Sequence, residues 1–394
     1  MTNGSLFLKN REENDIQDNQ GQIKKKVLFI TNVPSPYRVN FFNKFGKLVN
    51  LTVCFERRSA SGRDKSWTLG DTVSFNPIFM KGINTGSDKA FCPEIRKIIK
   101  SGGFDHIIVS CYSSPTAMSA IKYMRKRKIP YILSSDGGLI KDSGSGFLFK
   151  FKKHFISGAD AYLSTSGETD KYLIHYGALS DRIYRYPFTS LSEDDIFEAP
   201  SLAEEKTALR AELGLPQNSK IIVSVGRFIQ SKGFDVLIES AKSLPHSDYV
   251  CIIGGTPTEE YIELMQFHNV SCIHFEDFKP FSDLVKFYRA SDVFVLPTRT
   301  DVWGLVINEA MACGLPVITT EKCIAGVSLV KNGVNGHIVP IDNAEILAEK
   351  INNLLQKSSE EIFEAGKESI AIIKNYTVEK MAERHFEILS SFTH

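Results

Sequence analysis

The sequence predicts an α/β protein with two doubly wound, Rossmann-like domains in series. Short apolar runs alternate with helical patterns, many of these runs end in a polar or glycine-containing loop, and the alternation starts again after a linker near residues 187–200. A chain of 394 residues is long enough for two such domains. Doubly wound sheets bind ligands at the carboxyl ends of their strands, so we expect a ligand in an inter-domain cleft.

The N-terminal domain is predicted over residues 26–190. An arm of mostly Asn, Gln, Asp, Glu and Lys precedes it at residues 1–25 and is expected to be disordered. The expected strands lie at residues 27–31, 51–55, 106–110, 131–134 and 161–164, and the expected helices at 39–48, 116–128 and 147–157.

The C-terminal domain is predicted over residues 191–376. The expected strands lie at residues 221–225, 249–253, 270–274, 293–296 and 316–319. The expected helices lie at residues 203–213, 234–242, 259–267, 281–289, 305–313 and 344–357. A closing helix at 378–391, within the segment 377–394, is expected to pack back on the N-terminal domain.

Composition excludes several classes of function. The formal net charge is +1, so no basic excess points to a nucleic-acid partner. The seven cysteines are scattered without a CxxC pair, which indicates buried, reduced thiols and no metal site. No export signal or run of about 20 apolar residues is present, so we expect a cytoplasmic protein, soluble or peripheral at the inner face of the membrane.

The strongest motif spans residues 298–318, from Thr298 through a polar loop into a helix. Gly304 opens the helix, Asp301 lies in the loop, and Glu309 lies about one turn inside the helix. A helix N-terminus attracts phosphate, and carboxylates accept hydrogen bonds from sugar hydroxyls. This pattern suits a nucleotide sugar, although the spacing alone fits an ordinary strand–helix crossover with solvated acids equally well.

A second motif follows the first strand of the C-terminal domain. Gly226 permits a tight turn, and Arg227 and Lys232 add two positive charges near the carboxyl end of that strand. Two cations there would stabilise the negative charge of a departing diphosphate without a metal. The alternative is that both are ordinary surface residues.

Together these segments resemble the donor motif E-x7-E of the retaining glycosyltransferases of family GT4, which have the GT-B fold. Asp301 replaces the first glutamate and is one methylene shorter. The resemblance runs from about Lys26 to the C-terminus and is sharpest over residues 221–318. It implies a UDP- or GDP-type nucleotide-sugar donor, a donor-binding C-terminal domain and an acceptor-binding N-terminal domain. No cofactor is expected. The sequence has no DxD-like motif in the right place and no His/Cys/Asp cluster with metal spacing, so we predict an enzyme that needs no metal.

The resemblance also implies roles for individual residues. Arg227 and Lys232 would hold the diphosphate, Asp301 the sugar and Glu309 the ribose, while Gly254 would lie in a glycine-rich turn and Phe278 near the base. The predicted donor-binding residues are Gly226, Arg227, Lys232, Gly254, Phe278, Thr298, Asp301, Gly304, Leu305 and Glu309. The predicted catalytic residues are Arg227, Lys232, Asp301 and Asp136.

The N-terminal domain is less explicit. The loop at residues 32–38 lacks the Gly-Gly of many family members, so Arg38 either contacts phosphate or is a surface residue. Asp136 ends a strand where some members carry a histidine, and it is either a polar catalytic residue or a turn residue. Asp194 and Asp195 are interpreted as a solvated acidic patch.

Two basic segments, residues 122–128 and 147–155, indicate either contact with an anionic membrane or solvated helix faces. Membrane contact would suit a lipid-linked acceptor. We expect a glycan or lipid-linked acceptor, in bacterial polysaccharide or glycolipid assembly. Competing functions are a GT-B-like nucleotide-sugar epimerase, a phosphorylase and a catalytically silent donor-binding subunit.

Overall fold

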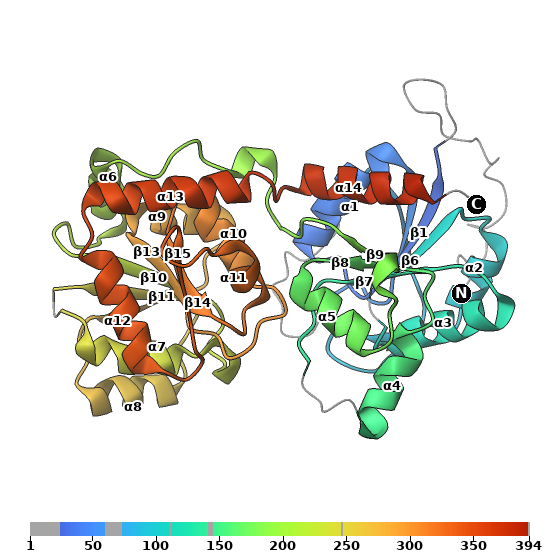
Figure 1. The fold of residues 1–394 in the computed structure, drawn as a ribbon, viewed down its shortest axis with the longest axis horizontal. Coiled ribbons are helices and arrows are strands. Elements are labelled where there is room, and N and C mark those ends of the chain that lie inside the picture. The colour runs from blue at the N-terminus through green and yellow to red at the C-terminus, as the bar shows by residue number, and fades with distance from the viewer. Residues whose placement is uncertain (1–23, 60–72, 111, 141–144, 246, 393–394) are drawn as a thin grey trace, which may run out of the picture. The chain divides into compact units, whose positions relative to one another are not determined.

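A computed structural model describes residues 24–59, 73–110, 112–140, 145–245 and 247–392 (Figure 1). It is an α/β structure with two sheets whose registered strand pairs are all parallel, as the sequence predicts. The predicted disordered arm lies outside the described residues except for Lys24 and Lys25, and so does Cys111. The other six cysteines are free and buried, in agreement with the prediction.

The first sheet has the strand order β3-β2-β1-β6-β7-β8-β9. Its strands are β1 (Lys26–Thr31), β2 (Asn50–Phe55), β3 (Asn76–Phe79), β6 (His106–Val109), β7 (Ile132–Ser135), β8 (Ala161–Ser164) and β9 (Ile183–Arg185). Its helices are α1 (Pro36–Leu48), α2 (Ile95–Ser101), α3 (Pro115–Arg127), α4 (Gly146–Ile156) and α5 (Gly167–His175). A small antiparallel pair joins β4 (Ile83–Asn84) to β5 (Ala90–Phe91).

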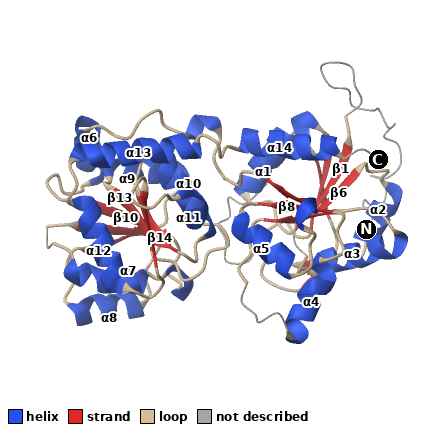
Figure 2. Ribbon diagram, in the orientation of Figure 1, coloured by secondary structure: helices blue, strands red, loops and turns tan. Residues whose placement is uncertain are grey.

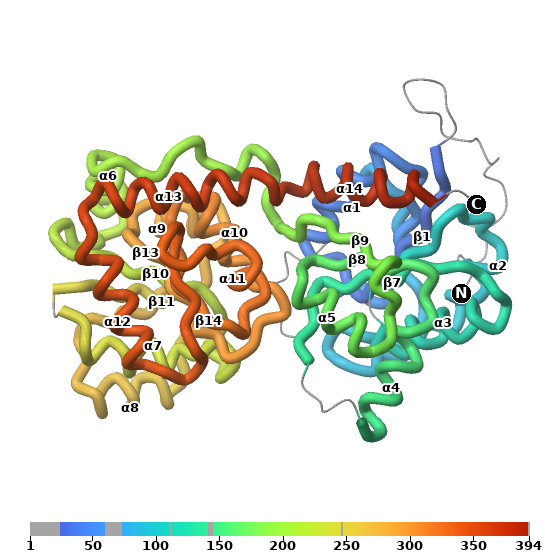
Figure 3. The backbone as a smooth tube through the Cα atoms, viewed as in Figure 1, coloured from blue at the N-terminus to red at the C-terminus, as the bar shows by residue number. Residues whose placement is uncertain are grey.

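The second sheet has the order β12-β11-β10-β13-β14-β15. Its strands are β10 (Ile221–Val225), β11 (Tyr249–Ile253), β12 (Ile273–Glu276), β13 (Val293–Leu296), β14 (Val317–Thr320) and β15 (Gly336–Val339). One face is covered by α7 (Phe234–Ser240), α8 (Glu259–His268) and α12 (Ala344–Leu355), and α12 lies beside α7 (Figures 2 and 3). The other face carries α6 (Ala203–Leu213), α9 (Phe281–Ala290), α10 (Leu305–Ala312) and α13 (Ser359–Ile373), with α11 (Ile324–Leu329) beside α10 and α13.

Burial on both faces explains why these strands are apolar along their whole length. Every residue of β10 and β13 is buried, as parallel strands between two helix layers require. The core on the α7 side includes Phe234, Leu237 and Ile351, each fully buried.

Backbone packing divides the chain into two compact units. The first comprises residues 1–134, 150–163 and 382–394, and the second comprises residues 135–149 and 164–381. The end of α14 (Val378–Ser391) belongs to the first unit, where the ring of His385 lies 4.7 Å from that of Phe41. The domain limits predicted from the sequence, at residues 190 and 376, stay predictions.

Several predicted elements begin or end elsewhere, and some were missed. The strand predicted at residues 270–274 is β12, Ile273–Glu276. The difference arises at the end of α8, where Asn269 adopts a left-handed conformation and the Val270 amide donates to the Met265 carbonyl. The missed elements include β3, β9, β15, α2, α5, α11 and α13. No helix in the described part of the chain is both long and apolar enough to span a membrane.

Candidate functional site

The strand order of the second sheet creates a topological switch point between β10 and β13. From β10 the chain moves outward to β11 and β12, and it then returns to β13 on the other side. The loops that follow these two neighbouring strands therefore diverge and leave room for a ligand at the carboxyl edge of the sheet. The predicted residues Gly226, Arg227 and Lys232 follow β10, while Thr298, Asp301 and Gly304 follow β13.

The two loops are joined by an ion pair. The Lys232 Nζ lies 2.6 Å from the Asp301 Oδ2, and each side chain is 18% exposed. Lys232 ends a short 3-10 turn, Gln230–Lys232, and its aliphatic chain passes over Gly226, where an added Cβ would lie 3.4 Å from the Lys232 Cδ. The sequence predicted separate ligands for this lysine and this aspartate, whereas here each is the other's partner.

Two neighbours of Asp301 hold the loops together. The Thr298 hydroxyl donates to the Ser231 carbonyl at 2.7 Å, and the Arg299 amide donates to the same carbonyl at 2.8 Å. The Thr298 side chain is fully buried and fixes the position of the turn that carries Lys232. Contact of Thr298 with a donor stays a prediction.

Arg299 was not predicted as a site residue. Its guanidinium forms ion pairs with Asp235, on α7, and with Asp342, and it also donates to the Gln230 carbonyl at 2.7 Å. The Asp235 hydrogen bond and charge raise the pKa of Arg299. The signal in the sequence was one more cation in the loop, but its two acidic partners lie far away along the chain.

Gly304 begins α10 beside the ion pair. Its φ of +102° favours glycine, and an added Cβ would lie 2.8 Å from the Cys323 Sγ and 3.6 Å from the Asp301 Oδ2. No side chain caps this helix, so its first amides, beginning with Leu305, have no intrahelical acceptor. Such a helix end favours an anion.

Arg227 contrasts with Lys232. Its side chain is exposed and makes no ion pair with any residue that the structure describes. Of the two cations that the sequence predicts for the diphosphate, Lys232 is thus held by an acid and Arg227 is available to a ligand.

The glycine-rich turn after β11 has a structural cause. An added Cβ on Gly254 would lie 1.9 Å from the carbonyl oxygen of Gly226, so the close backbone approach is to the chain's own neighbouring loop. The predicted approach of Gly254 to a ligand stays a prediction. Phe278, in the loop after β12, is 65% exposed and so is open to an aromatic partner.

Glu309 lies on α10, where the Tyr288 hydroxyl donates to its Oε2 at 3.1 Å. Burial raises the pKa of Glu309 to about 7, although the hydrogen bond from Tyr288 opposes this rise. Tyr288, on α9, was not predicted. One carboxylate oxygen has a protein partner, and the group changes its charge near neutral pH.

The candidates in the N-terminal part differ from their predictions. Asp136 accepts a hydrogen bond from the Tyr186 hydroxyl at 3.2 Å. Arg38 is only 5% exposed and lies over the ring of Phe29, so it is not a surface residue. Asp195 caps a 3-10 turn by accepting from the Ser192 amide at 2.7 Å, so it is not merely a solvated acid.

A buried acid at the first sheet was missed. Glu56, just after β2, is 3% exposed, accepts a hydrogen bond from the Ala90 amide at 2.9 Å and another from the Ser114 hydroxyl. Burial raises its pKa to about 6. Nearby, Asn32 donates to Asp88 at 2.7 Å and Lys89 donates to Ser113 at 3.1 Å. A glutamate after an apolar strand gave no distinctive signal.

Within the described ranges, no group of three or more His, Cys, Asp or Glu residues could hold a metal ion.

Residues 205–370 match the family described as "Glycosyl transferases group 1". The chain is 32% identical over 212 residues to D-inositol 3-phosphate glycosyltransferase of Xylanimonas cellulosilytica, covering 50% of this chain and 49% of the relative. It is 36% identical over 148 residues to the capsular polysaccharide biosynthesis glycosyltransferase CapM of Staphylococcus aureus, covering 35% and 37%. The matched region thus spans about half or less of these relatives.

Solved structures resemble nearly the whole chain. Anabaena HepE in complex with UDP has a TM-score of 0.76 at 17% identity, covering 93% of this chain and 100% of that one. Sucrose-phosphate synthase from Thermosynechococcus elongatus has a TM-score of 0.72 at 17% identity, covering 93% and 98%. At this identity the likeness establishes the fold, which is the predicted GT-B class with two Rossmann-like domains.

Proposed function

We propose that this protein is a glycosyltransferase that moves a sugar from a nucleotide-diphosphate sugar to a hydroxyl acceptor. The observation that carries the proposal is the Lys232–Asp301 pair beside the uncapped N-terminus of α10. This arrangement offers a cation, a carboxylate and free amides at one switch point, inside the region that matches the group 1 glycosyltransferases. A phosphate group suits the cation, sugar hydroxyls suit the carboxylate, and phosphate oxygens suit the free amides.

The ion pair supports a specific exchange of partners. In the reaction, the bond between the anomeric carbon and the diphosphate oxygen breaks, and negative charge grows on the diphosphate. Lys232 would turn from Asp301 to this diphosphate, joined by Arg227, which lowers the barrier to departure without a metal. Asp301, released from the lysine, would accept hydrogen bonds from the donor sugar. The shorter aspartate then serves two partners in turn.

The remaining donor contacts follow from the same loops. The free amides at Gly304 and Leu305 would hold phosphate oxygens, and Glu309 would accept from the ribose hydroxyls with its orientation set by Tyr288. The exposed ring of Phe278 suits stacking on a base. Anabaena HepE binds UDP and UDP-glucose, which supports a UDP-type donor over a GDP-type one.

The finer features of the reaction are also proposals. The N-terminal domain would bind the acceptor, Asp136 would contact the reacting sugar with help from Tyr186, and the sugar would keep its anomeric configuration. The name of the CapM relative supports a bacterial polysaccharide as the product. The anomer formed in the first minutes of reaction, measured by proton NMR, tests retention, since an inverted anomer overturns it.

The decisive experiment is a panel of UDP- and GDP-sugars with and without glycan and lipid-linked acceptors, following nucleotide release with and without EDTA. We expect turnover with a UDP-sugar that EDTA leaves unchanged. Sugar transfer distinguishes this function from an epimerase, which would change the donor sugar without releasing nucleotide. A donor that binds but never turns over with any acceptor would favour the silent subunit.

A second proposal concerns peripheral membrane contact at the cytoplasmic face. Phe147 and Leu148, at the start of α4, are 84% and 58% exposed and lie next to Lys150 and Lys153 on the same helix. Exposed apolar groups beside lysines suit an anionic bilayer surface. In the alternative, this helix has a solvated face and its Phe side chains lie in the core. The buried Phe155 fits that alternative, but the exposed Phe147 does not.

Vesicle co-sedimentation tests this contact. We expect binding to vesicles with 30% phosphatidylglycerol, on the order of tenfold weaker for Phe147→Ser. Phe267→Ser is the matched control, because Phe267 is 82% exposed on α8. Equal binding of both variants, or no binding by the wild type, overturns the contact.

A further inference from the structure

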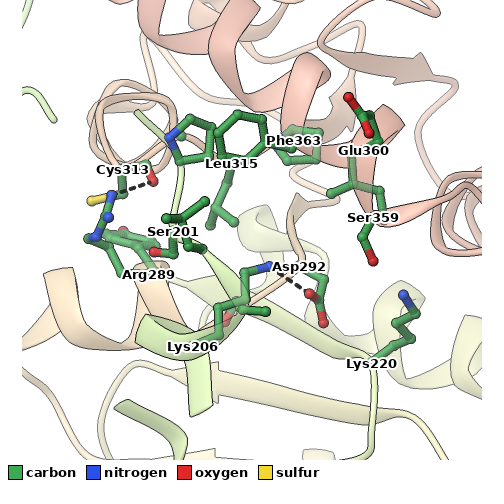
Figure 4. Close-up of a pocket in the computed structure, with 18 residues that line it drawn as sticks. Ser201, Lys206, Lys220, Arg289, Asp292, Cys313, Leu315, Ser359, Glu360 and Phe363 are labelled. Carbon is green, nitrogen blue, oxygen red and sulfur yellow. Dashed lines mark hydrogen bonds and ion pairs between the residues drawn. The ribbon is translucent and has the colours of Figure 1, made fainter. Parts of the chain in front are cut away.

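A cavity of about 380 Å³ lies at the amino edge of the second sheet (Figure 4). Its lining includes Lys220, just before β10, Asp292, just before β13, and Pro316, just before β14. Because these strands are parallel, this is the edge opposite to the one that carries Lys232 and Asp301. The cavity is therefore separate from the proposed donor site.

The cavity has an apolar wall and a charged floor. Leu315 and Phe363 lie on one side, and Lys206, Asp292 and Lys220 lie on the other (Figure 4). A volume of this size suits a compound with one ring, and most protein sites for such compounds combine apolar walls with a few polar groups.

The floor carries an excess of positive charge. The Asp292 carboxylate accepts from the Lys206 Nζ at 2.7 Å, from the Arg210 guanidinium at 2.9 Å and from the Ile221 amide at 2.8 Å. One acid thus faces two cations. Lys220 adds a third cation, and it makes no ion pair with any residue in the described ranges. Asp248 lies close enough to interact with Lys220 electrostatically, so the three cations and two acids of the floor have a net charge of +1, while Glu360 adds one acid on the side of Phe363 (Figure 4).

Two further polar features face the cavity without a partner. The Ser201 side chain is 7% exposed, and its hydroxyl has no hydrogen bond within the part of the chain that the structure describes. A buried hydroxyl without a partner is costly, so a ligand that bonds to it gains affinity. Next to it, α6 begins at Ala203 with no side-chain cap, which leaves its first amides available to an acceptor.

We propose that this cavity is a regulatory binding site for a small organic oxyanion. The phosphate or carboxylate head would face Lys206 and Lys220, the compact apolar body would lie against Leu315 and Phe363, and a polar substituent would reach Ser201. A neutral compound leaves the positive excess unmatched, and an inorganic ion leaves the apolar wall empty. Both are therefore weaker occupants than a ring that carries an anionic head.

The route to the donor site is short, and this part of the proposal rests on the proposed function. Helix α10 carries Glu309, while Cys313, Gly314 and Leu315, just beyond its end, line the cavity. Tyr288 also lines the cavity and donates to Glu309, and Arg289 donates to the Cys313 carbonyl at 3.5 Å. An occupant therefore touches both residues that position this helix from α9. Any change in nucleotide affinity must be reciprocal.

Direct binding tests the site without relying on catalysis. Isothermal titration of the full chain with phenyl phosphate and with 3-phenylpropionate should give Kd values below about 1 mM, while benzyl alcohol and inorganic phosphate bind at least tenfold more weakly. Lys220→Met should weaken phenyl phosphate at least tenfold and Ser201→Ala about threefold, and both changes leave existing hydrogen bonds intact. The exposed Lys331→Met is the matched control. Lys232→Met should keep full probe affinity, which separates this cavity from the donor site.

Three results overturn the binding site: no binding by either oxyanion at 10 mM, equal affinity for benzyl alcohol, or unchanged affinity in both Lys220→Met and Ser201→Ala. Coupling is read from the Kd of UDP with the cavity saturated, which should change at least threefold in either direction and revert in Lys220→Met. An unchanged Kd overturns the regulatory role. Absence of UDP binding with intact probe binding would instead count against the proposed function.

Discussion

The two sheets share one strand order near their centres but differ in the chemistry at their switch points. In the second sheet, the loops after β10 and β13 hold Arg227, Lys232 and Asp301, all at least partly accessible. In the first sheet, the region after β1, β2 and β6 holds the buried acid Glu56, capped by Ser114. The same fold places both regions, but their side chains give the second a partly accessible Lys–Asp pair and the first a buried acid with neutral donors.

The difference extends to how each acid is paired. Asp301 has a cation as its partner in an ion pair, whereas Glu56 accepts hydrogen bonds from neutral donors and burial raises its pKa to about 6. A site for a charged substrate needs groups that can change partners at low cost. The following predictions, ordered by their effect on donor turnover, test this contrast.

The largest effect is expected for Lys232→Met. Loss of the cation that meets the departing diphosphate should lower kcat about 1000-fold, because charge stabilisation acts in the transition state. The substitution also leaves Asp301 half-buried without its partner, so the melting temperature should fall. Kinetics and calorimetry check the two effects.

A double variant separates these two roles of Lys232. Lys232→Met with Asp301→Asn removes both charges of the pair, so we expect the melting temperature to recover while kcat stays low. If more than a tenth of the activity remains in Lys232→Met, this lysine does not serve the leaving group.

A smaller effect is expected for Arg227→Ala. This exposed side chain has no ion pair among the described residues, so its removal should lower kcat/KM about 100-fold and leave the melting temperature unchanged. Arg182→Ala is the matched control, since Arg182 is also exposed and makes no ion pair with any residue that the structure describes. Equal kinetics for both variants would remove Arg227 from the diphosphate site.

The pH dependence of donor affinity should reveal Glu309. Its pKa is raised to about 7, so the group is protonated below that pH and loses an acceptor for the ribose. Affinity for the nucleotide sugar should therefore fall about tenfold from pH 8 to pH 6. Tyr288→Phe removes a hydrogen bond that lowers this pKa, so the midpoint should move to higher pH, and Glu309→Gln should flatten the profile. Titration calorimetry measures all three, and a flat wild-type profile contradicts this role.

Local patterns predicted most of the second sheet and its helices. The limits of β10, α6 and α14 agree with the structure, because each has a clear apolar run or a clear helical period with definite ends. The edge strand β3 was missed because Pro77 lies inside it, and proline normally argues against a strand. Its place at the edge of the sheet makes the proline tolerable.

The site was predicted as a set of residue types but not as a set of contacts. Lys232 and Asp301 are 69 positions apart, so their pairing depends on how two loops meet and not on any local spacing. Thr298 and Gly254 belong to the motifs, but the motifs do not show their contacts. Thr298 holds the turn that carries Lys232, and Gly254 makes room for the Gly226 carbonyl. Tyr288 and Arg299 lie at the site only because α9 and the β13 loop bring them there.

The smallest effect on donor turnover is expected for Glu56→Gln. Glu56 lies at the other switch point, and its substitution should change donor affinity less than twofold.

The effect of Glu56→Gln appears in stability instead. Because burial raises the pKa of Glu56 from 4.5 to about 6, the protonated form favours the folded state, and this contribution is lost as pH rises through that window. The loss amounts to about 2 kcal/mol at most. The free energy of unfolding in urea, measured between pH 4 and pH 7, should therefore depend less on pH in the variant than in the wild type. Glu309 contributes equally to both proteins, so its contribution cancels when they are compared. A tenfold loss of donor affinity would show that the first switch point also meets the donor.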